Sequence, residues 1–288
     1  MTQKARLELP KPRRPDGHKG TYGKVLVVAG SVSMPGAAVL VGNGALRGGA
    51  GLVTIATPRS ALPMIAPSVT CATFLPLPET SQGSLSLAAR ARILEQAERS
   101  DAVVLGPGLG TAPATVRLVR RLAATLKRPL VLDADGLNAI ADDPDCVARR
   151  SSPTLMTPHP GELSRLDGLP VPEGAADRKR RAEAAAERFQ AIICLKGHRT
   201  VVTDGRRTYI NPTGNPGLGT GGSGDVLSGL LGALLSQFES PLQAAIFGVH
   251  VHGKAGDLAA DCNGQIAMIA TDLFDTLGPA ITLTIGQR

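Results

Sequence analysis

The chain has 288 residues, of which 43% are hydrophobic and 19% charged, and its formal net charge is +7. Aromatic residues make up only 2%, which argues against a single-stranded nucleic-acid site, because such sites need aromatic stacking platforms. The four cysteines form no Cys-x-x-Cys pair, and no apolar segment resembles a signal peptide or reaches the roughly 18 residues of a membrane helix. We therefore expect a cytoplasmic protein that contacts neither a membrane nor nucleic acid.

The N-terminal segment is strongly basic, and we expect residues 1–17 to form a solvated arm. An anionic partner such as nucleic acid is the weaker alternative for this arm.

After the arm, short apolar segments predict strands at Lys24–Ala29, Leu52–Thr57, Asp101–Leu105, Pro129–Asp133, Thr154–Met156, Ala191–Lys196, Val201–Thr203 and Arg207–Ile210. Helical patterns predict helices at Gly36–Gly49, Thr115–Leu126, Glu173–Phe189, Asp225–Leu235, Leu242–Ala260 and Asp272–Ile285.

This alternation of strands and helices predicts an α/β fold. Continuous apolar strands indicate a mostly parallel sheet that helices cover on both faces. We find no long linker and no convincing repeat, so we expect a single domain over residues 1–288. Ligands of such sheets bind beyond the carboxyl ends of the strands, which is where the Gly-rich segments of this chain fall.

The densest run of glycines, Gly-Thr-Gly-Gly-Ser-Gly-Asp at 219–225, precedes a predicted helix. Exposed backbone amides at a helix N-terminus form a natural phosphate or oxyanion site, and Asp225 lies in the first turn of that helix. One alternative is a simple helix start after a tight turn. The other is a dinucleotide fingerprint, which is disfavoured because the segment before Gly219 is rich in Pro and Gly and is no strand.

Two further segments follow predicted strands. In Lys196-Gly-His-Arg-Thr200, backbone groups and the threonine suit an adenine or phosphate pocket, although an ordinary turn with a solvated lysine explains the segment more simply. In Met156-Thr-Pro-His-Pro-Gly-Glu162, two prolines fix the loop and hold His159 at a strand end. This histidine either hydrogen-bonds a ligand or caps a backbone carbonyl, and the residue types alone do not choose between the two.

The segment Asp133-Ala-Asp135-Gly-Leu-Asn138 places two carboxylates and an amide at a strand end, which suits water-mediated Mg²⁺ binding or a polar ligand. The alternative is structural. In that case Asp135 caps a short helix that begins at Gly136, and Asp133 supports the surrounding structure. We favour a structural or supporting role for Asp133.

Two other features have equally ordinary explanations. Gly106-Pro-Gly-Leu-Gly110 closes a strand and either lets a ligand pack on bare backbone or forms a tight turn. His250 and His252 are two positions apart in a helical pattern, so they face different sides and form no metal pair. The chain contains no Walker A motif, so any nucleotide is held in another way.

Taken in order, these motifs resemble those of the ribokinase-like superfamily, and more narrowly those of the ADP/ATP-dependent (S)-NAD(P)H-hydrate dehydratases. The resemblance covers roughly residues 18–285. It rests on His18–Ser31, Gly36–Leu40, Ala45–Thr54, Gly106–Gly110, Asp133–Asn138, Thr157–Glu162, Lys196–Thr200 and Gly214–Gly229. It implies a ribokinase-like three-layer sandwich with a mostly parallel central sheet and helices on both faces.

The resemblance also implies a lyase that repairs nicotinamide nucleotides. Such an enzyme phosphorylates the ring hydroxyl of the S epimer of hydrated NADH or NADPH, after which phosphate leaves and NAD(P)H is restored. ADP or ATP donates the phosphoryl group and becomes AMP or ADP, and Mg²⁺ is the implied partner of the phosphates. Similarity to bacterial relatives favours ADP, although no residue decides between the two nucleotides.

The site residues implied by the resemblance fall into two groups, with no residue implied as a metal ligand. Asp225 is the implied catalytic base and a substrate contact. The other implied substrate contacts are Ala38, Gly108 and His159. The implied nucleotide contacts are Lys196, Gly197, His198, Arg199, Thr200, Gly221, Gly222, Ser223 and Gly224.

Departures from the family pattern are small. Gly48, Gly136 and Gly219 replace other small residues and put little in doubt. Bifunctional relatives carry an N-terminal epimerase domain, which the short arm does not provide, so we expect a separate epimerase. Family members tend to assemble, and we expect a homo-oligomer, in particular a tetramer.

Two rival functions remain. One is a kinase of a small alcohol, such as a thiazole or pyridoxine-type vitamin precursor, whose product is a stable phosphomonoester. The other is a nucleotide-binding regulatory or scaffold protein on an inactive kinase fold. The intact Asp225 and the intact Gly-rich loop argue against the second.

Overall fold

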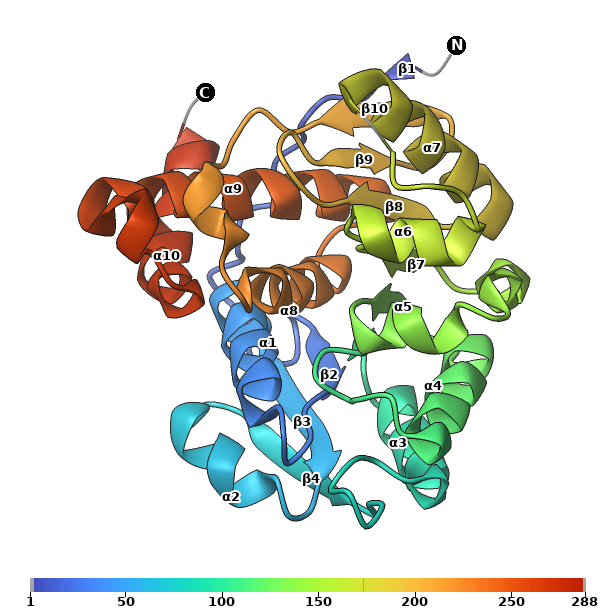
Figure 1. Cartoon of the computed structure of the whole chain (residues 1–288). Helices are drawn as coiled ribbons and strands as arrows, with labels where there is room; N and C mark the ends of the chain where they lie inside the picture. The colour runs from blue at the N-terminus through green and yellow to red at the C-terminus, as the bar shows by residue number, and fades with distance from the viewer. Residues whose placement is uncertain (1–2, 173, 287–288) are drawn as a thin grey trace.

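The sheet organises the molecule. The structure, a computed structural model, describes residues 3–172 and 174–286. Within them one ten-stranded sheet has the order β1-β10-β9-β8-β7-β6-β5-β2-β3-β4 (Figure 1). The strands are β1 (Gln3–Lys4), β2 (Lys24–Val28), β3 (Leu52–Pro58), β4 (Thr73–Leu77), β5 (Ala102–Leu105), β6 (Leu130–Leu132), β7 (Thr154–Met156), β8 (Ile192–Leu195), β9 (Val201–Thr203) and β10 (Arg207–Ile210). Neighbouring strands run parallel except at β9, which is antiparallel to both β8 and β10.

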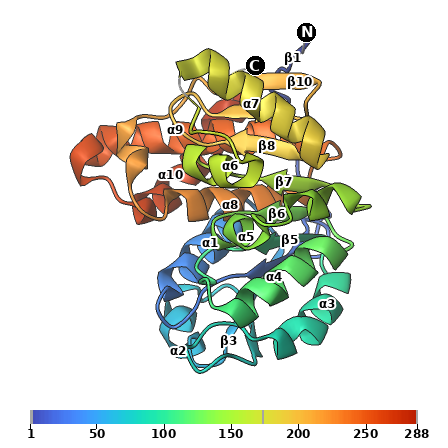
Figure 2. The same cartoon turned by 45° about the vertical axis from the view of Figure 1, so that its right-hand side comes forward.

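Helices cover both faces of this sheet and complete three layers (Figure 1). One face carries α1 (Pro35–Arg47), α8 (Ser223–Leu235), α9 (Pro241–Ala267) and α10 (Leu273–Gly286). The other carries α3 (Arg90–Glu98), α4 (Pro113–Thr125), α5 (Asp135–Ile140), α6 (Pro160–Asp167) and α7 (Gly174–Phe189), and α4 to α7 come forward in the turned view of Figure 2. Shorter helical turns are α2 (Leu62–Ile65), η1 (Ala66–Ser68), η2 (Leu87–Ala89), η3 (Pro144–Arg149), η4 (Pro216–Gly219) and η5 (Ala270–Asp272).

The strands were recognisable in the sequence because they are buried on both sides. In β2, Val25 and Val27 belong to the core beneath α1 and α8, whereas Leu26 and Val28 belong to the core on the opposite face. A strand between two helical layers needs apolar residues at every position, which gives a continuous apolar segment.

Two glycine contacts bring α1 and α8 unusually close. A Cβ built on Gly229 would lie 2.0 Å from the carbonyl oxygen of Val41, and one on Gly44 would lie 2.5 Å from that of Val226. Only glycine permits such a close approach of two helix backbones. The contact holds α8, and with it Asp225, firmly against the neighbouring helix.

Several elements had no counterpart in the predictions, and for β4, α3 and α2 the reasons are identifiable. The strand β4 contains Pro76 and lies at the edge of the sheet, where a proline is tolerated but obscures the pattern. The helix α3 buries only Ile93 and Ala97, so its apolar periodicity is weak. The third, α2, is a single turn of four residues.

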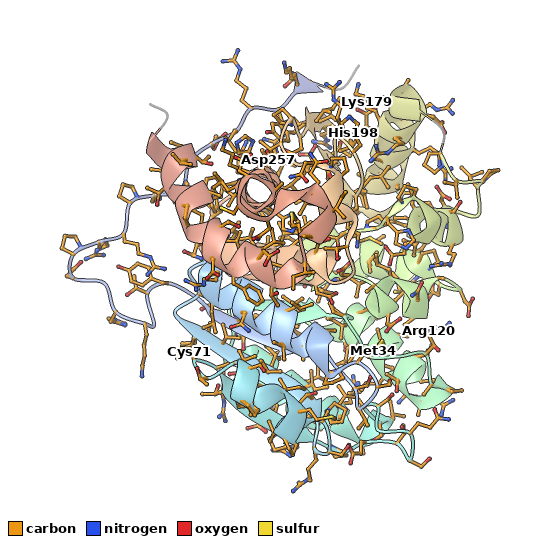
Figure 3. The ribbon with its side chains drawn as sticks, turned by 60° about the vertical axis from the view of Figure 1, so that its left-hand side comes forward. Met34, Cys71, Arg120, Lys179, His198 and Asp257 are labelled. Atoms are coloured by element: carbon orange, nitrogen blue, oxygen red, sulfur yellow. The ribbon has the colours of Figure 1, made fainter. Side chains whose placement is uncertain are left out.

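The N-terminal arm is not solvated along its whole length, and that prediction was wrong for its first part. The strand β1 pairs with β10, Ala5 is buried, and the amide of Glu8 donates to Oε1 of Gln243 at 3.2 Å. The edge strand β10 offers unpaired backbone groups, and the arm satisfies them. Residues 11–17 are mostly exposed and project as a loop (Figure 3).

Among the described helices, none combines the length and the apolar character that crossing a bilayer requires.

Candidate active site

A cavity of about 780 Å³ lies beyond the carboxyl ends of β6, β7 and β8. Its walls come from the loops after these strands, from the segment after β10, from the N-terminus of α8 and from one side of α9. Parallel strands bring all these loops to one edge of the sheet, as expected for this class of fold. The lining residues include Asp133, His159, Asp225, 196–200, 213–216 and 222–224.

The Gly-rich loop ends on the first turn of α8. Gly222 is the N-cap of this helix and has a φ of 93°, a left-handed conformation that glycine adopts without strain. At this helix start the N–H of Asp225 donates to the carbonyl of Gly222 at 3.0 Å, whereas those of Ser223 and Gly224 have no acceptor within the helix, and the helix dipole favours negative charge there. Nothing lies within 4 Å of a Cβ built on Gly219 or Gly221, so neither glycine is explained by packing against the protein. The loop therefore has free space beside exposed backbone donors, as a phosphate requires.

Asp225 lies in this first turn and faces the cavity. Burial raises the pKa of its carboxyl to about 7, and the negative charge of Asp133 adds to the effect, while the Lys196 ammonium opposes it. A carboxylate with a pKa near neutrality is suited to accept a proton from an alcohol, because a general base works best when its pKa lies near the working pH.

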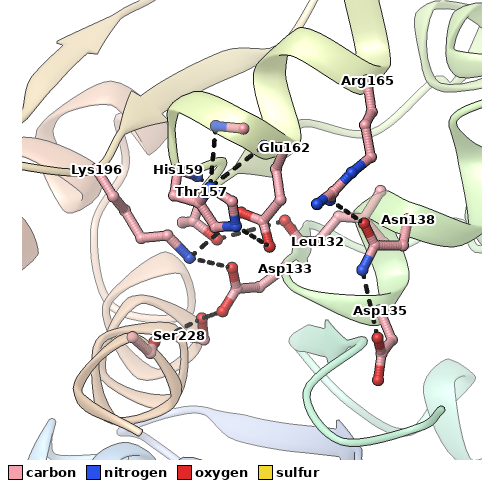
Figure 4. Close-up of polar contacts among 12 residues, drawn as sticks. Leu132, Asp133, Asp135, Asn138, Thr157, His159, Glu162, Arg165, Lys196 and Ser228 are labelled. Atoms are coloured by element: carbon pink, nitrogen blue, oxygen red, sulfur yellow. Dashed lines mark hydrogen bonds and ion pairs between the residues drawn. The ribbon is translucent and has the colours of Figure 1, made fainter. Parts of the chain in front are cut away.

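A buried ion pair holds the centre of the site together (Figure 4). Nζ of Lys196 lies 2.8 Å from Oδ1 of Asp133 and 3.7 Å from Oε2 of Glu162, and the hydroxyl of Ser228 donates to Oδ2 of Asp133 at 2.6 Å. Burial alone would lower the pKa of Lys196, but the carboxylates of Asp133 and Glu162 outweigh it and raise the pKa. Asp133 is 1% exposed and binds protein groups through both oxygens, in line with the supporting role expected for it.

Asp135 does not cap the helix that follows β6, so the structural alternative considered for this residue is wrong. The N-cap of α5 is Ala134, and Asp135 is the first residue of the helix. Its Oδ2 instead accepts a hydrogen bond from the amide of Gly110 at 2.8 Å. The carboxylate thereby ties the loop after β5 to the start of α5. A partner 25 positions away in the chain cannot be read from local sequence.

His159 is the N-cap of α6. Its Nδ1 accepts hydrogen bonds from the amides of Gly161 and Glu162 at 3.0 and 3.3 Å, and the Glu162 carboxylate accepts from the His159 amide at 2.7 Å (Figure 4). The histidine thus caps amides rather than a carbonyl, which corrects the structural alternative drawn from the sequence. Because Nδ1 accepts, Nε2 carries the proton of the neutral ring. The half-exposed ring also lines the cavity, so a ligand contact stays open to it.

The turn between β8 and β9 lines the opposite wall. Gly197 and Arg199 have φ values of 124° and 56°, so the turn depends on an uncommon backbone shape. The guanidinium of Arg178 supports it from α7 by donating to the carbonyls of Leu195, Lys196 and His198. Sequence reasoning missed Arg178, because nothing distinguishes it from the other arginines of its helix.

Two expected substrate contacts lie outside this cavity. The side chain of Ala38 is fully buried in α1. Gly108 is also buried, with a φ of 65°, and a Cβ built on it would lie 2.9 Å from the carbonyl oxygen of Met34. Gly221 too is absent from the cavity wall. The structure thus gathers Asp225, His159, the 196–200 turn and residues 222–224 around one space, but not these three residues.

The donors of the site fit a nucleotide phosphate better than a metal held by protein alone. The described residues contain no group of three or more His, Cys, Asp or Glu side chains arranged to hold a metal ion. The amides of α8 and the Lys196 ammonium, in contrast, suit phosphate oxygens. Mg²⁺ commonly binds through substrate phosphates together with one or two carboxylates, and Asp225 is a carboxylate that lines the cavity.

Comparison with known proteins gives a consistent result. The model of a family described as NAD(P)H-hydrate dehydratase matches residues 25–279. The bifunctional NAD(P)H-hydrate repair enzyme of Moorella thermoacetica is 46% identical over 274 residues, which are 94% of this chain and 51% of the relative. The ADP-dependent (S)-NAD(P)H-hydrate dehydratase of Bacillus subtilis is 37% identical over 274 residues, which are 94% of this chain and 93% of the relative.

Solved structures agree with the sequence comparison. The ADP/ATP-dependent NAD(P)H-hydrate dehydratase from Bacillus subtilis, co-crystallized with ATP/Mg²⁺, superposes with a TM-score of 0.79 at 33% identity and covers 96% of this chain and 94% of its own. A ribokinase-like superfamily protein from Enterococcus faecalis has a TM-score of 0.80 at 23% identity, covering 96% and 92%, and shows the fold alone. The resemblance found in the motifs and the ribokinase-like fold are thereby confirmed. The chain spans about half the length of the bifunctional relative, 51%.

Proposed function

Because the chain belongs to the NAD(P)H-hydrate dehydratase family, we propose that it restores NADH and NADPH from the S epimer of their hydrated forms, with an adenine nucleotide as co-substrate. The observation that carries the proposal is the placement of Asp225. Its carboxyl, with a pKa of about 7, lies at the N-terminus of α8 beside a 780 Å³ cavity lined by Lys196 and the Gly-rich loop. A base beside a phosphate cradle is the arrangement that phosphorylation of an alcohol needs.

The chemistry runs in two steps. Asp225 takes the proton of the ring hydroxyl as the hydroxyl oxygen attacks the terminal phosphorus, and the bond to the leaving nucleotide breaks. Phosphate then leaves with the ring oxygen, and loss of a proton from the neighbouring carbon restores the double bond. The loop amides and Lys196 stabilise charge on the transferred phosphoryl group, mainly by position and electrostatics. Mg²⁺, when bound with the nucleotide, neutralises further phosphate charge.

The residue assignments follow from the family motifs together with the cavity. We assign Lys196–Thr200 and Gly221–Gly224 to the adenine nucleotide, and Ala38, Gly108 and His159 to the hydrated dinucleotide. For Ala38, which lies in α1, and Gly108, which lies in the loop after β5, the assignment requires backbone contacts, because both residues are buried. The Bacillus subtilis enzyme is named ADP-dependent, and we propose ADP as the donor.

Several broader properties belong to the same proposal. The continuous sheet supports a single catalytic domain. The four cysteines are free, which supports a reducing compartment such as the cytoplasm. We further propose a homo-oligomer, in particular a tetramer, and an epimerase that supplies the S epimer. A small-alcohol kinase is the less favoured alternative, since the family match extends over residues 25–279.

The test is an absorbance assay. Purified protein is mixed with hydrated NADH, present as both epimers, together with Mg²⁺ and either ADP or ATP. A rise in dihydronicotinamide absorbance that needs protein and nucleotide, with equimolar phosphate release, supports the proposal and identifies the donor. Folded protein that gives no rise with either nucleotide overturns it and favours the kinase of a small alcohol, whose product retains the phosphate.

A further inference from the structure

A histidine of α9 lines the cavity beside the Gly-rich loop and reaches the first turn of α8. His252 is 8% exposed, and its Nε2 lies 2.9 Å from the carbonyl oxygen of Ser223. A carbonyl only accepts, so Nε2–H is the donor. Burial lowers the pKa of His252 to about 4, and the positive charge of Lys196 also lowers it, so the ring is neutral near pH 7.

The Ser223 carbonyl is significant because the N–H on the other side of the same peptide group belongs to Gly224. The carbonyl of Ser223 and the N–H of Gly224 belong to one planar trans peptide, and they point in opposite directions. Gly224 is the second residue of α8, so its N–H has no partner within the helix. Gly224 lines the cavity, and a Cβ built on it would lie 3.4 Å from Nζ of Lys196.

A donor that binds the carbonyl has two effects on the amide. It fixes the rotation of the peptide plane, and it polarises the peptide so that the N–H becomes a stronger donor. We propose that His252 is a positioning residue of the dehydratase, which acts through the Ser223–Gly224 peptide to aim the Gly224 amide at the transferred phosphoryl group. This inference rests on the proposed function.

The rest of α9 supports the same segment. The Asp257 carboxylate accepts hydrogen bonds from the Gly214 amide at 3.1 Å and from the Asn215 side chain at 3.2 Å. The Thr213 hydroxyl donates to the carbonyl of His250 at 2.8 Å. Asp257 lies on the helix seen end-on in Figure 3. The helix α9 therefore holds the segment that follows β10 in place. His252 is the residue through which α9 contacts the first turn of α8.

Three variants separate positioning from simple packing. His252→Leu removes the donor, His252→Gln keeps a donor at similar reach, and His252→Asn keeps a polar group that is one carbon too short. We expect His252→Leu and His252→Asn to lower kcat about 10- to 100-fold while KM for the dinucleotide changes little, since loss of an orienting partner typically has this size. His252→Gln should recover most of the loss. His250→Leu is the matched control, because the His250 ring contacts Tyr209 rather than the loop.

A second measurement does not depend on turnover. The amide proton and nitrogen shifts of Gly224, followed by NMR during ADP titration, should move strongly on binding in wild type and in His252→Gln, and only weakly in His252→Leu. Unchanged kcat in a folded His252→Leu or His252→Asn variant, or a His252→Gln variant as impaired as these, overturns the inference. If the wild type has no dehydratase activity, the proposed function fails, whereas the NMR result still decides whether His252 controls the Gly224 amide.

Discussion

The pH dependence of turnover tests the environment of Asp225 directly. Burial and the charge of Asp133 raise the pKa of its carboxyl to about 7. The base must be ionised to accept a proton, so kcat/KM should fall below about pH 7, by about tenfold for each further unit. At about pH 5 only about 1% of the plateau rate should remain. An ordinary aspartate, with a pKa of about 4, would retain about 90% of its activity at that pH.

The substitution Asp133→Asn tests whether the acid limb of the pH profile, the fall of kcat/KM below about pH 7, reflects the ionisation of Asp225. It removes the negative charge that raises the pKa of Asp225 most, while the amide oxygen still accepts from Lys196. The limb should therefore move to lower pH, by about one unit for a charge effect of about 1.4 kcal/mol. Initial rates of absorbance increase at saturating nucleotide, from about pH 5 to 9, give the profile, and the titration of the nucleotide phosphates is the same for both proteins.

Two results would refute this reasoning. One is a wild-type limb near pH 4, which would mean that Asp225 is well solvated or is not the base. The other is an unshifted limb in a folded Asp133→Asn variant, which would assign the limb to the nucleotide instead. Asp142→Asn is the matched control, because Asp142 is an exposed carboxylate that pairs with Arg120, and it should leave the profile unchanged.

Three further substitutions follow from the site and its supports. Asp225→Asn should lower turnover by about 10²- to 10⁴-fold without loss of nucleotide affinity by calorimetry. It should also raise the melting temperature at about pH 8. The pKa of Asp225 is higher in the folded protein than in the unfolded chain, so ionisation of this carboxyl above about pH 7 destabilises the folded state, and the uncharged asparagine removes that cost. His159→Ala removes the N-cap of α6, costs about 1 kcal/mol in chemical denaturation, and should raise KM for the dinucleotide more than Kd for the nucleotide; equal losses would indicate a purely structural histidine. Gly229→Ala forces a methyl group against the Val41 carbonyl and should destabilise the protein by about 1–3 kcal/mol, whereas Gly36→Ala, with nothing within 4 Å, should not.

Local sequence was enough to predict the layers of the fold and the helix start that carries Asp225. Strands such as β2 and β5 are buried on both faces, so their residues are apolar apart from the exposed Lys24 at the start of β2, and this continuous pattern is visible without any structure. The glycines before Asp225 mark a helix N-terminus with exposed amides, which is also a local property. The order of motifs then pointed to the family that the comparisons show.

Contacts between distant parts of the chain were decided only by the tertiary structure. The strand β1 exists because Gln3 pairs with Arg207 at an open sheet edge. The bonds of Lys196 to Asp133 and of Ser228 to Asp133 join residues 63 and 95 positions apart. The shifted pKa of Asp225 depends on that convergence and on burial, neither of which a sequence motif records. The sequence thus predicted the residues that we propose to carry the chemistry, and the packing of strands and helices determined the charges around them.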